Sequence, residues 1–239
     1  MHPKMQIEKG FSKLWYISRF DLLMGMSKQE MQNVAAMTRM TSHRRGDLIY
    51  LPGDPSNSIY FLKEGRMKIT GLGEDGHEVL LEIIGPGEIF GEASAIQETP
   101  RTTTAEALED ALLCEMDRKD FEGLLSMHPE MSLRVLKHVG FRLKKVEAQL
   151  LSLICKDVPT RVREALVGLV DNGSASSPTT PVKIRLTQQD VANLVGASRQ
   201  ETSRALKDLE YSGVLELKYR SIIVTAPDRL RSGPILRAH

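Results

Sequence analysis

The chain has little cysteine and no long apolar run. Only Cys114 and Cys155 occur among its 239 residues, far apart and without a spacing motif. This argues against a disulfide framework and fits a reducing compartment. No apolar run approaches the ~18 residues of a membrane span, and residues 1–11 mix Lys with Glu where a signal peptide would be apolar. We therefore expect a soluble cytoplasmic protein without a membrane partner.

The chain also lacks enzyme signatures and a strong net charge. It contains no Walker phosphate loop, no metal ligands at catalytic spacing and no nucleophile motif, so we expect no enzyme and neither a catalytic nor a metal site. The formal net charge is +1, but residues 183–239 hold ten Lys and Arg against six Asp and Glu. A basic C-terminal part fits a nucleic-acid binder, although chance asymmetry also produces an excess of this size.

Hydrophobic residues make up 41% of the chain, which is enough for packed cores. Ser27 and Glu30 form a capping-box signal that opens a short helix to about Met40. Nine of the 18 glycines then fall between Gly46 and Gly91. Short β-type runs lie at 48–51, 59–62, 67–70, 79–84 and 111–115. Short strands separated by Gly, Pro and Asp turns predict an antiparallel sandwich or jelly roll.

A long helix is predicted over residues 129–156. Its apolar residues recur every seven positions in two sets, Leu136, Leu143 and Leu150, and Val139, Val146 and Leu153. This pattern predicts a coiled-coil seam between two copies of the chain, although a helix packed on its own domain has the same period. Pro159 then interrupts the helix and marks a hinge. The polar segment 172–181 is predicted to be a loop.

The strongest motif, at residues 186–206, predicts two short helices joined by a glycine turn. Thr187 opens the first helix with a capping signal, and Ser198 opens the second. Gly196 can adopt the left-handed conformation that ends the first helix. This is the arrangement of a DNA-binding helix-turn-helix, and residues 213–225 look like the β-hairpin of a winged helix.

The second of these helices is expected to enter the major groove of DNA by its N-terminal end. Arg at that end can donate two hydrogen bonds to guanine, and Gln can pair with adenine. The candidate DNA-binding residues are Thr187, Gln188, Ser198, Arg199, Gln200, Ser203, Arg204 and Lys207. For the arginines, the alternative is a solvated helix face. Glu201 is interpreted as the acid of the capping box.

A second dense motif lies at residues 90–105, where a Gly-Glu turn precedes a short helical segment and a Pro-Arg-Thr sequence. Backbone N–H groups at a helix start bind anions, and Arg101 can grip a phosphate through two hydrogen bonds. Glu92 can accept a hydrogen bond from a ribose hydroxyl. The two side chains suit a sugar-phosphate ligand, and the alternative is an internal Glu92–Arg101 ion pair without a ligand.

On these two motifs the chain, from about residue 20 to residue 230, resembles the CRP/FNR family of transcription regulators. Residues 90–102 resemble the phosphate-binding cassette of cyclic-nucleotide-binding domains, and residues 198–204 resemble the family's recognition helix. The resemblance implies that the position of Glu92 contacts the ribose and that those of Arg101 and Thr102 contact the cyclic phosphate. It also implies a homodimer joined through the long helix, with RNA polymerase as a partner and the 172–181 loop as a candidate contact.

The chain departs from the family pattern in three places, and in the first of them Ala93 and Ser94 follow Gly-Glu where the family usually has a larger apolar residue and then a small one. Members that respond to cyclic AMP carry a Thr-Ser pair that meets the adenine, where this chain has Val146 and Glu147. Val146 cannot hydrogen-bond, whereas Glu147 can accept from an exocyclic amine or be solvated. Gln200 stands where many members have Glu. A Glu accepts a hydrogen bond from cytosine, whereas a Gln prefers the edge of a different base. The candidate ligand-binding residues are Gly91, Glu92, Ala93, Arg101, Thr102, Val146 and Glu147.

Two other effector classes of such regulators find little support. An iron–sulfur cluster needs a group of cysteines that the chain lacks. A haem needs an axial ligand, for which His43, His77, His138 and Cys155 are candidates, but lone histidines are more often surface or packing residues. We therefore expect neither an iron–sulfur cluster nor a haem.

Together these observations predict an α+β protein in three parts. A β jelly-roll sensor domain is expected over residues 1–128, a dimerisation helix and hinge over 129–158, and a winged helix-turn-helix domain over 159–239. The expected function is that of a homodimeric transcription regulator that binds a palindromic site in double-stranded DNA under control of a cyclic nucleotide such as cyclic AMP. The alternatives are a ligand-independent regulator controlled by its expression level and a regulator gated by a different effector.

Overall fold

The computed structural model describes residues 20–74, 76–95, 99–171 and 181–232. Its strands are β1 (Thr38–His43), β2 (Leu48–Tyr50), β3 (Ser58–Glu64), β4 (Met67–Leu72), β5 (Glu78–Ile84), β6 (Ile89–Phe90), β7 (Thr104–Ala107), β8 (Ala111–Asp117), β9 (Val182–Ile184), β10 (Leu215–Lys218) and β11 (Ser221–Val224). Its helices are η1 (Asp21–Leu23), α2 (Lys28–Met37), η2 (Glu92–Ala95), α3 (Arg118–Met127), α4 (Pro129–Cys155), α5 (Val158–Asp171), α6 (Gln188–Val195), α7 (Arg199–Tyr211) and α8 (Pro227–Arg231).

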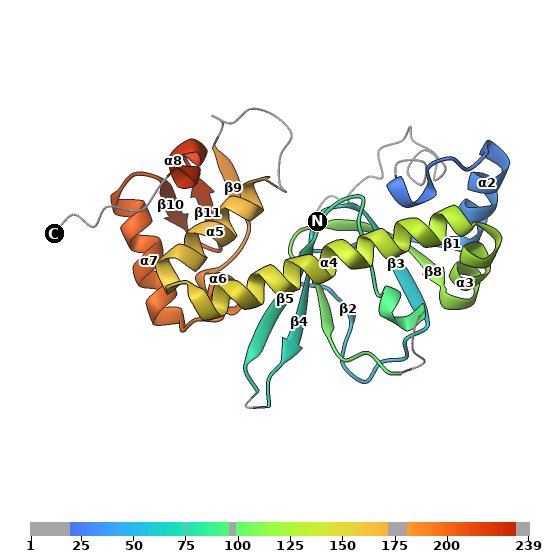
Figure 1. The fold of residues 1–239 in the computed structure, drawn as a ribbon, viewed down its shortest axis with the longest axis horizontal. Helices are drawn as coiled ribbons and strands as arrows, with labels where there is room; N and C mark the ends of the chain where they lie inside the picture. The colour runs from blue at the N-terminus through green and yellow to red at the C-terminus, as the bar shows by residue number, and fades with distance from the viewer. Residues whose placement is uncertain (1–19, 75, 96–98, 172–180, 233–239) are drawn as a thin grey trace, which may run out of the picture.

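The N-terminal part is built from two four-stranded antiparallel sheets, with strand orders β1-β8-β3-β6 and β2-β7-β4-β5. Strands that follow one another along the chain mostly belong to different sheets, as in a jelly roll. The long helix α4 crosses the front of these sheets and leads to the separate C-terminal part (Figure 1). The predicted α+β class, with a β-sheet sensor, a long helix and a C-terminal helix-turn-helix, is confirmed.

The two faces of β3 are both buried, against different partners. Ile59 and Phe61 belong to a core with helices α2, α3 and α4, whereas Tyr60 and Leu62 point into the core between the two sheets. Side chains alternate between the faces of a strand, so an unbroken apolar run is expected where both faces are covered. β8 follows the same rule.

The predicted end of the first helix at about Met40 is wrong. The capping box of Ser27 and Glu30 is present, but α2 ends at Met37. The next residue, Thr38, is already extended and begins β1, which pairs with β8 along its whole length. The backbone hydrogen bonds of this ladder outweigh the helical propensity of the residues at the end of α2.

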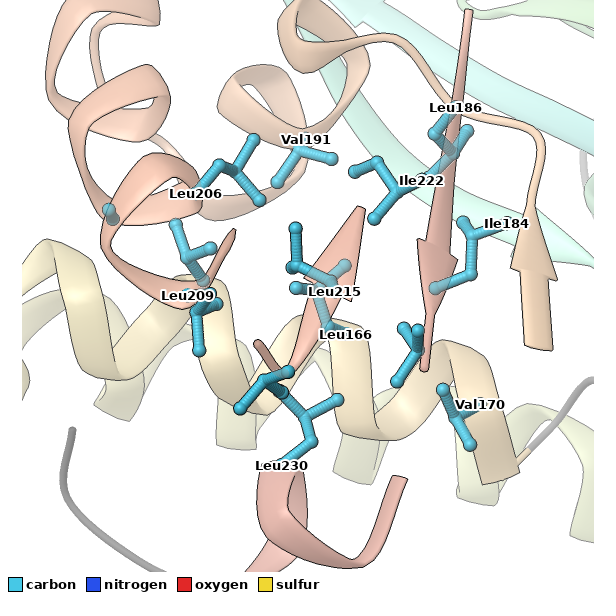
Figure 2. Packing of buried hydrophobic residues seen from close by; sticks show 14 of the residues in the cluster. Leu166, Val170, Ile184, Leu186, Val191, Leu206, Leu209, Leu215, Ile222 and Leu230 are labelled. Carbon is cyan, nitrogen blue, oxygen red and sulfur yellow. The ribbon is translucent and has the colours of Figure 1, made fainter. Parts of the chain in front are cut away.

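The C-terminal part packs α5, α6, α7 and α8 around a three-stranded sheet with the order β10-β11-β9. Leu166 from α5, Leu206 from α7 and Ile222 from β11 meet in its core (Figure 2). β10 and β11 pair as a hairpin, which confirms the expected wing. Leu108 of the barrel is buried in this same core, so the two parts are docked on each other.

The break between α4 and α5 lies at the predicted hinge. α4 ends at Cys155, Lys156 is extended, and α5 begins at Val158 with Pro159 in its first turn. Proline is tolerated in the first turn of a helix because its missing N–H has no intrahelical partner there. Most of the segment 172–181, predicted as a loop and as a contact for RNA polymerase, lies outside the described residues.

Candidate functional site

A cavity of about 980 Å³ lies between the barrel, α4 and the C-terminal part. The barrel contributes its walls from β2, β5, β6 and residues 99–103, and α4 contributes residues between Arg142 and Leu153. Helices α5 and α6 close the far end. Because both parts of the molecule line it, an occupant would touch the barrel and the helix-turn-helix region together.

Arg101 is buried in this cavity, with 7% of its surface exposed. Its Nη1 donates to the carbonyl oxygen of Gly91 at 3.0 Å, and its Nη2 donates to that of Ser58. The guanidinium also lies over the ring of Tyr50, 4.5 Å from its centre. These contacts fix the plane of the guanidinium before any ligand arrives, and such preorganisation reduces the entropic cost of binding.

The backbone at Gly91 requires glycine for two reasons. Its φ is +79°, a conformation that side chains rarely adopt. A Cβ at this position would also lie 2.9 Å from Arg101 Nη1 and 3.2 Å from the carbonyl oxygen of Ser58. Gly91 therefore allows the close approach that holds Arg101 in the cavity.

Glu92 is paired with α4 and not with Arg101. One carboxylate oxygen, Oε1, accepts from Nη1 of Arg142, whose Nε lies 2.7 Å from a carboxylate oxygen of Glu82. Burial lowers the pKa of Arg142, but the charges of Glu92 and Glu82 outweigh this effect and raise it above its ordinary value. The internal Glu92–Arg101 ion pair considered as an alternative is thus absent from the described residues.

Among the described residues, three polar atoms of side chains that line this cavity are buried with neither a hydrogen-bond nor an ion-pair partner. They are the second carboxylate oxygen of Glu92, Nε of Arg101 and Nε of Arg161. Buried polar atoms of this kind are costly and usually find partners, so they mark places where a bound group would be stabilised. The cavity therefore offers one acceptor, on Glu92, and two charged donors, on Arg101 and Arg161, to a ligand.

The structure places most, but not all, of the predicted ligand residues in the cavity. Gly91, Glu92, Ala93, Arg101, Thr102 and Val146 line it. Glu147 is exposed and does not line it, because it lies on the side of α4 that faces away from the barrel. The expectation that Glu147 meets a ligand therefore depends on a second copy of the chain.

The helix-turn-helix forms as the capping signals predict. Thr187 and Asp190 form a complete capping box at α6, and Ser198 and Glu201 form one at α7. The hydrogen bond from Ser198 is the main cause of a lowered pKa of the Glu201 carboxyl. Gly196 ends α6 with φ +58° and ψ +49°, the predicted left-handed conformation.

The recognition helix α7 has one buried and one open face. Thr202, Ala205, Leu206 and Leu209 pack into the C-terminal core. Arg199, Gln200, Arg204 and Lys207 are exposed, and Ser203 is half-buried beside them. Thr187 and Gln188 are half-buried at the start of α6. The predicted base readers thus share one accessible surface, and their contacts with DNA stay a prediction.

Three polar contacts join the barrel to the C-terminal part. Lys68 of β4, only 8% exposed, lies 2.9 Å from Glu106 and 3.6 Å from Asp190 of α6. Burial lowers the pKa of Lys68, but its acidic neighbours outweigh this effect and raise it. Arg185 lies 3.5 Å from Glu109, and Arg45 donates to the carbonyl oxygen of Arg220 at 3.5 Å. These contacts and the buried Leu108 fix how the parts dock.

Sequence reasoning missed several cavity residues. Arg142 lies four residues before Val146, so the helical period places both near the same face of α4, and this signal was available. Tyr50 comes from β2, and no local pattern connects it with Arg101, 51 residues later. Gln149, Arg161 and Glu164 line the far end of the cavity, which exists only because the two parts are docked.

A jelly-roll barrel with a phosphate-type cassette, joined by a long helix to a winged helix-turn-helix, is the architecture of a DNA-binding regulator of transcription. The family model for the cyclic nucleotide-binding domain matches residues 40–128, and that for the Crp-like helix-turn-helix domain matches residues 160–232. In the sequence, one match ends just before the long helix α4 and the other begins just after it.

Curated relatives match most of the chain. The CRP-like cAMP-activated global transcriptional regulator of Mycobacterium tuberculosis is 33% identical over 201 residues, which are 82% of this chain and 90% of the relative. The cyclic AMP receptor protein of Thermus thermophilus is 28% identical over 196 residues, covering 82% of this chain and 88% of the relative. The chain belongs to the CRP/FNR family of transcription regulators, with a helix-turn-helix DNA-binding domain.

Solved structures share the fold. The c-di-GMP responsive global regulator CLP of Xanthomonas campestris superposes with a TM-score of 0.70 at 23% identity, covering 84% of this chain and 100% of that one. A CRP/FNR-family transcriptional regulator of Thermus thermophilus gives 0.66 at 23% identity, covering 81% and 96%. The matched relatives are regulators and not enzymes, in agreement with the sequence-based expectation.

Two further findings concern the described part of the chain alone. None of its helices is long and apolar enough to cross a bilayer. Within the same residues, no group of three or more His, Cys, Asp or Glu side chains is placed to hold a metal ion.

Proposed function

We propose that this protein acts as a homodimer on a palindromic operator and that a cyclic nucleotide such as cyclic AMP, bound in the cavity, controls its affinity for DNA. The observation that carries the proposal is the pair of buried, unpartnered atoms, Glu92 Oε2 and Arg101 Nε. A ribose hydroxyl can donate to the first, and a phosphate oxygen can accept from the second.

The rest of the cavity suits a nucleobase. Apolar side chains also line the cavity, namely Leu81 and Ile83 of β5, Val146 of α4 and Leu169 of α5. A ligand of nucleotide size is held mainly by apolar contact, with a few polar groups that fix its orientation. Two of the curated relatives carry cyclic AMP in their names, which supports the same choice of ligand.

The proposed dimer uses the outer face of α4. The apolar residues exposed on this helix are Leu133, Leu136, Phe141, Leu143, Val146, Leu150, Leu151, Leu153 and Ile154. Seven-residue spacing aligns Leu136, Leu143 and Leu150 in one stripe, as in a coiled coil. Such an apolar stripe is rarely left in water, so a second α4 is the proposed cover. Glu147, beside this stripe, would then face the partner's cavity.

Dimerisation explains how the recognition helices would read DNA. Two copies of α7 related by a two-fold axis fit half-sites about one helical turn, or ~34 Å, apart. Arg199, Gln200 and Arg204 are the proposed base readers, and Thr187, Gln188 and Lys207 the proposed phosphate contacts. We propose double-stranded DNA and RNA polymerase as partners in the cytoplasm, and domain boundaries at residues 128 and 158.

Calorimetric titration with cyclic AMP and cyclic GMP tests the ligand. We expect heat from at least one nucleotide and its loss in Arg101→Gln. Selection of bound DNA from a random pool, with and without the nucleotide, then yields the operator and its ligand dependence. No heat from either nucleotide, at concentrations well above micromolar, would exclude these two as effectors.

A second candidate is a regulator that needs no ligand. The ion pair between Arg142 and Glu92 favours it, because an internal cation already neutralises the carboxylate that a ribose would use. In that case the protein stripped of ligand binds its operator tightly, and added cyclic nucleotide changes the affinity less than twofold. The same DNA-binding measurements decide between the two candidates.

A further inference from the structure

The turn between α6 and α7 is held by side chains that line the cavity. Nε2 of Gln149, from α4, donates to the carbonyl oxygen of Leu194 at 3.0 Å. Nη1 of Arg161, from α5, donates to the carbonyl oxygens of Val195 at 2.6 Å and Gly196 at 3.3 Å. Both side chains also line the cavity described above. We call this arrangement, Gln149 and Arg161 on residues 194–196, the turn clamp.

The turn clamp supplies hydrogen-bond donors to carbonyl groups at the C-terminal end of α6. The last carbonyl groups of a helix have no partner within it and must be satisfied from outside. Within α6, the carbonyl oxygen of Ala192 already accepts from the N–H groups of Gly196 and Ala197. The next carbonyls along the turn depend on Gln149 and Arg161, which belong to other helices. The position of this turn is therefore set by α4 and α5.

Packing adds to these hydrogen bonds. A Cβ on Gly196 would lie 2.7 Å from Cδ2 of Leu153, so α4 lies directly against the turn. Leu153 is one turn of helix beyond Gln149. The end of α4 thus contacts the turn through one polar and one apolar side chain. A movement of this helix end must carry the turn with it or break these contacts.

The turn clamp is close in sequence to the residues that read DNA. Ser198, the N-cap of the recognition helix, follows Gly196 by two residues, and Arg199 comes next. The charge of Arg161 also contributes to the lowered pKa of Glu201, after the larger effect of the Ser198 hydrogen bond. A shift of the turn would therefore change the position of α7 at the end that enters the major groove.

We propose that Gln149 is a positioning residue that couples the occupant of the cavity to the recognition helix. Its amide N–H holds the turn, and its amide oxygen can accept a hydrogen bond from an exocyclic amine of a base. Arg161 offers a second group, because its Nε is buried without a hydrogen-bond partner in the described part of the chain. The preferred ligand is thus a nucleotide whose base carries an N–H donor. This inference rests on the proposed function.

The test compares operator affinity without and with cyclic AMP, as a ratio of dissociation constants, on the operator selected from the random pool. Gln149→Met keeps the side-chain length but has neither donor nor acceptor. Gln149→Lys keeps a donor for the carbonyl of Leu194. Lys144→Met is the matched control, because Lys144 is exposed on the same helix and does not line the cavity.

We expect Gln149→Met to lower this ratio at least fivefold while calorimetry still shows nucleotide binding. Gln149→Lys should recover part of the ratio, and Lys144→Met should leave it unchanged. A ratio in Gln149→Met within fivefold of the wild-type ratio overturns the proposal. So does an equal loss of operator affinity with and without nucleotide, since this is what a purely structural role predicts.

Failure of the proposed ligand is recognised separately. If the unaltered protein gives no heat with either nucleotide, hydrogen exchange at the amide of Ala197 decides whether the turn clamp positions the turn. This amide donates to the carbonyl oxygen of Ala192 at 3.1 Å and is protected while the turn is held. Exchange at least tenfold faster in Gln149→Met than in Lys144→Met supports the positioning role, and similar rates overturn it.

Discussion

The cavity and the recognition helix differ in how far apart in the chain their residues lie. The recognition helix takes its readers, its cap and its buried face from residues 198–209. The cavity takes its lining from residues between Tyr50 and Val195, on strands and helices of both parts. One is a convex surface built by one helix, and the other is a concave space between several elements.

This difference has a physical basis. A helix presents side chains at a fixed period of 3.6 residues, so its two faces can be read directly from the sequence. A cavity is the space that remains after packing, and its shape depends on how elements dock. Arg101 illustrates the point, because Tyr50, Ser58 and Gly91 hold its side chain from three separate segments.

The largest expected effect is on the cavity. Arg101→Gln removes the charge proposed to hold a phosphate, so cyclic-nucleotide affinity should fall by about 2–5 kcal/mol, the usual range for loss of one partner of a buried charge pair. Isothermal titration calorimetry measures the loss. Arg39→Gln, at an exposed ion pair with Glu115, is the control and should bind normally. Full affinity in Arg101→Gln would place the ligand elsewhere.

The second-largest effect is expected at Lys68, which joins the barrel to the C-terminal part. Lys68→Met keeps the apolar stem but leaves Glu78, Glu106 and Asp190 without their shared cation, and should weaken docking by about 1.5–3 kcal/mol. Hydrogen exchange of α6 should accelerate. Asp190 still caps α6 through Thr187, so the helix itself should persist.

Lys183→Met is the control for this change, because Lys183 is exposed on β9. Equal exchange rates in the two variants would mean that the other contacts, around Leu108 and between Arg185 and Glu109, hold the parts together without Lys68. Lys68 would then not be needed to connect the barrel with the helix-turn-helix.

The recognition helix should show a smaller and more specific response. Arg199→Ala and Arg204→Ala should each cost about 1–3 kcal/mol of operator affinity and relax the preference at one base pair. Lys207→Ala should weaken binding to all sequences about equally and lower its salt dependence. Titration of operator and mismatched DNA at several salt concentrations measures both. Uniform loss in all three variants would show that the arginines contact only phosphates.

The smallest effect is expected at the cap of this helix. Ser198→Ala removes the two hydrogen bonds that the hydroxyl group makes with Glu201 but keeps the one from the backbone N–H, and should destabilise the C-terminal part by about 0.5–2 kcal/mol, measured by urea unfolding. The lowered pKa of Glu201 means that the part of this stabilisation that comes from its carboxylate is present above the ordinary carboxyl pKa and is lost as pH falls through the lowered value. Ser198→Ala should therefore lose less stability on acidification than the unaltered protein. Ser232→Ala, at an exposed serine past the end of α8, is the control.

The strands and helices with strong local signals were predicted well. The five β-type runs all coincide with strands, and both capping boxes of the helix-turn-helix form. The sequence analysis missed β1, whose residues Thr38–His43 include Arg, Ser and His and lack a clear alternation. It also missed β7 and β9, which are short and are stabilised by neighbouring strands.

In the candidate site, residues within one local motif were likewise predicted, whereas contacts between distant segments were not. Arg101, Glu92 and Gly91 were identified because they lie within one short motif. Glu92 forms its ion pair with Arg142, 50 residues later, and not with Arg101, the pair that was the alternative to a ligand site. Glu147 was predicted to contact a ligand from the position it has in the family alignment. In the structure it does not line the cavity of the same chain.

By itself the sequence determined the elements whose physics is local: the capped helices of the helix-turn-helix, the left-handed Gly196 between them, the heptad stripe of α4 and the phosphate-type cassette. Only the tertiary structure decided what fills the space between them. Arg142, Gln149 and Arg161 lie in the cavity because α4, α5 and α6 dock against the barrel. That docking depends on contacts such as Lys68 with Asp190, 122 residues apart, which no local pattern specifies.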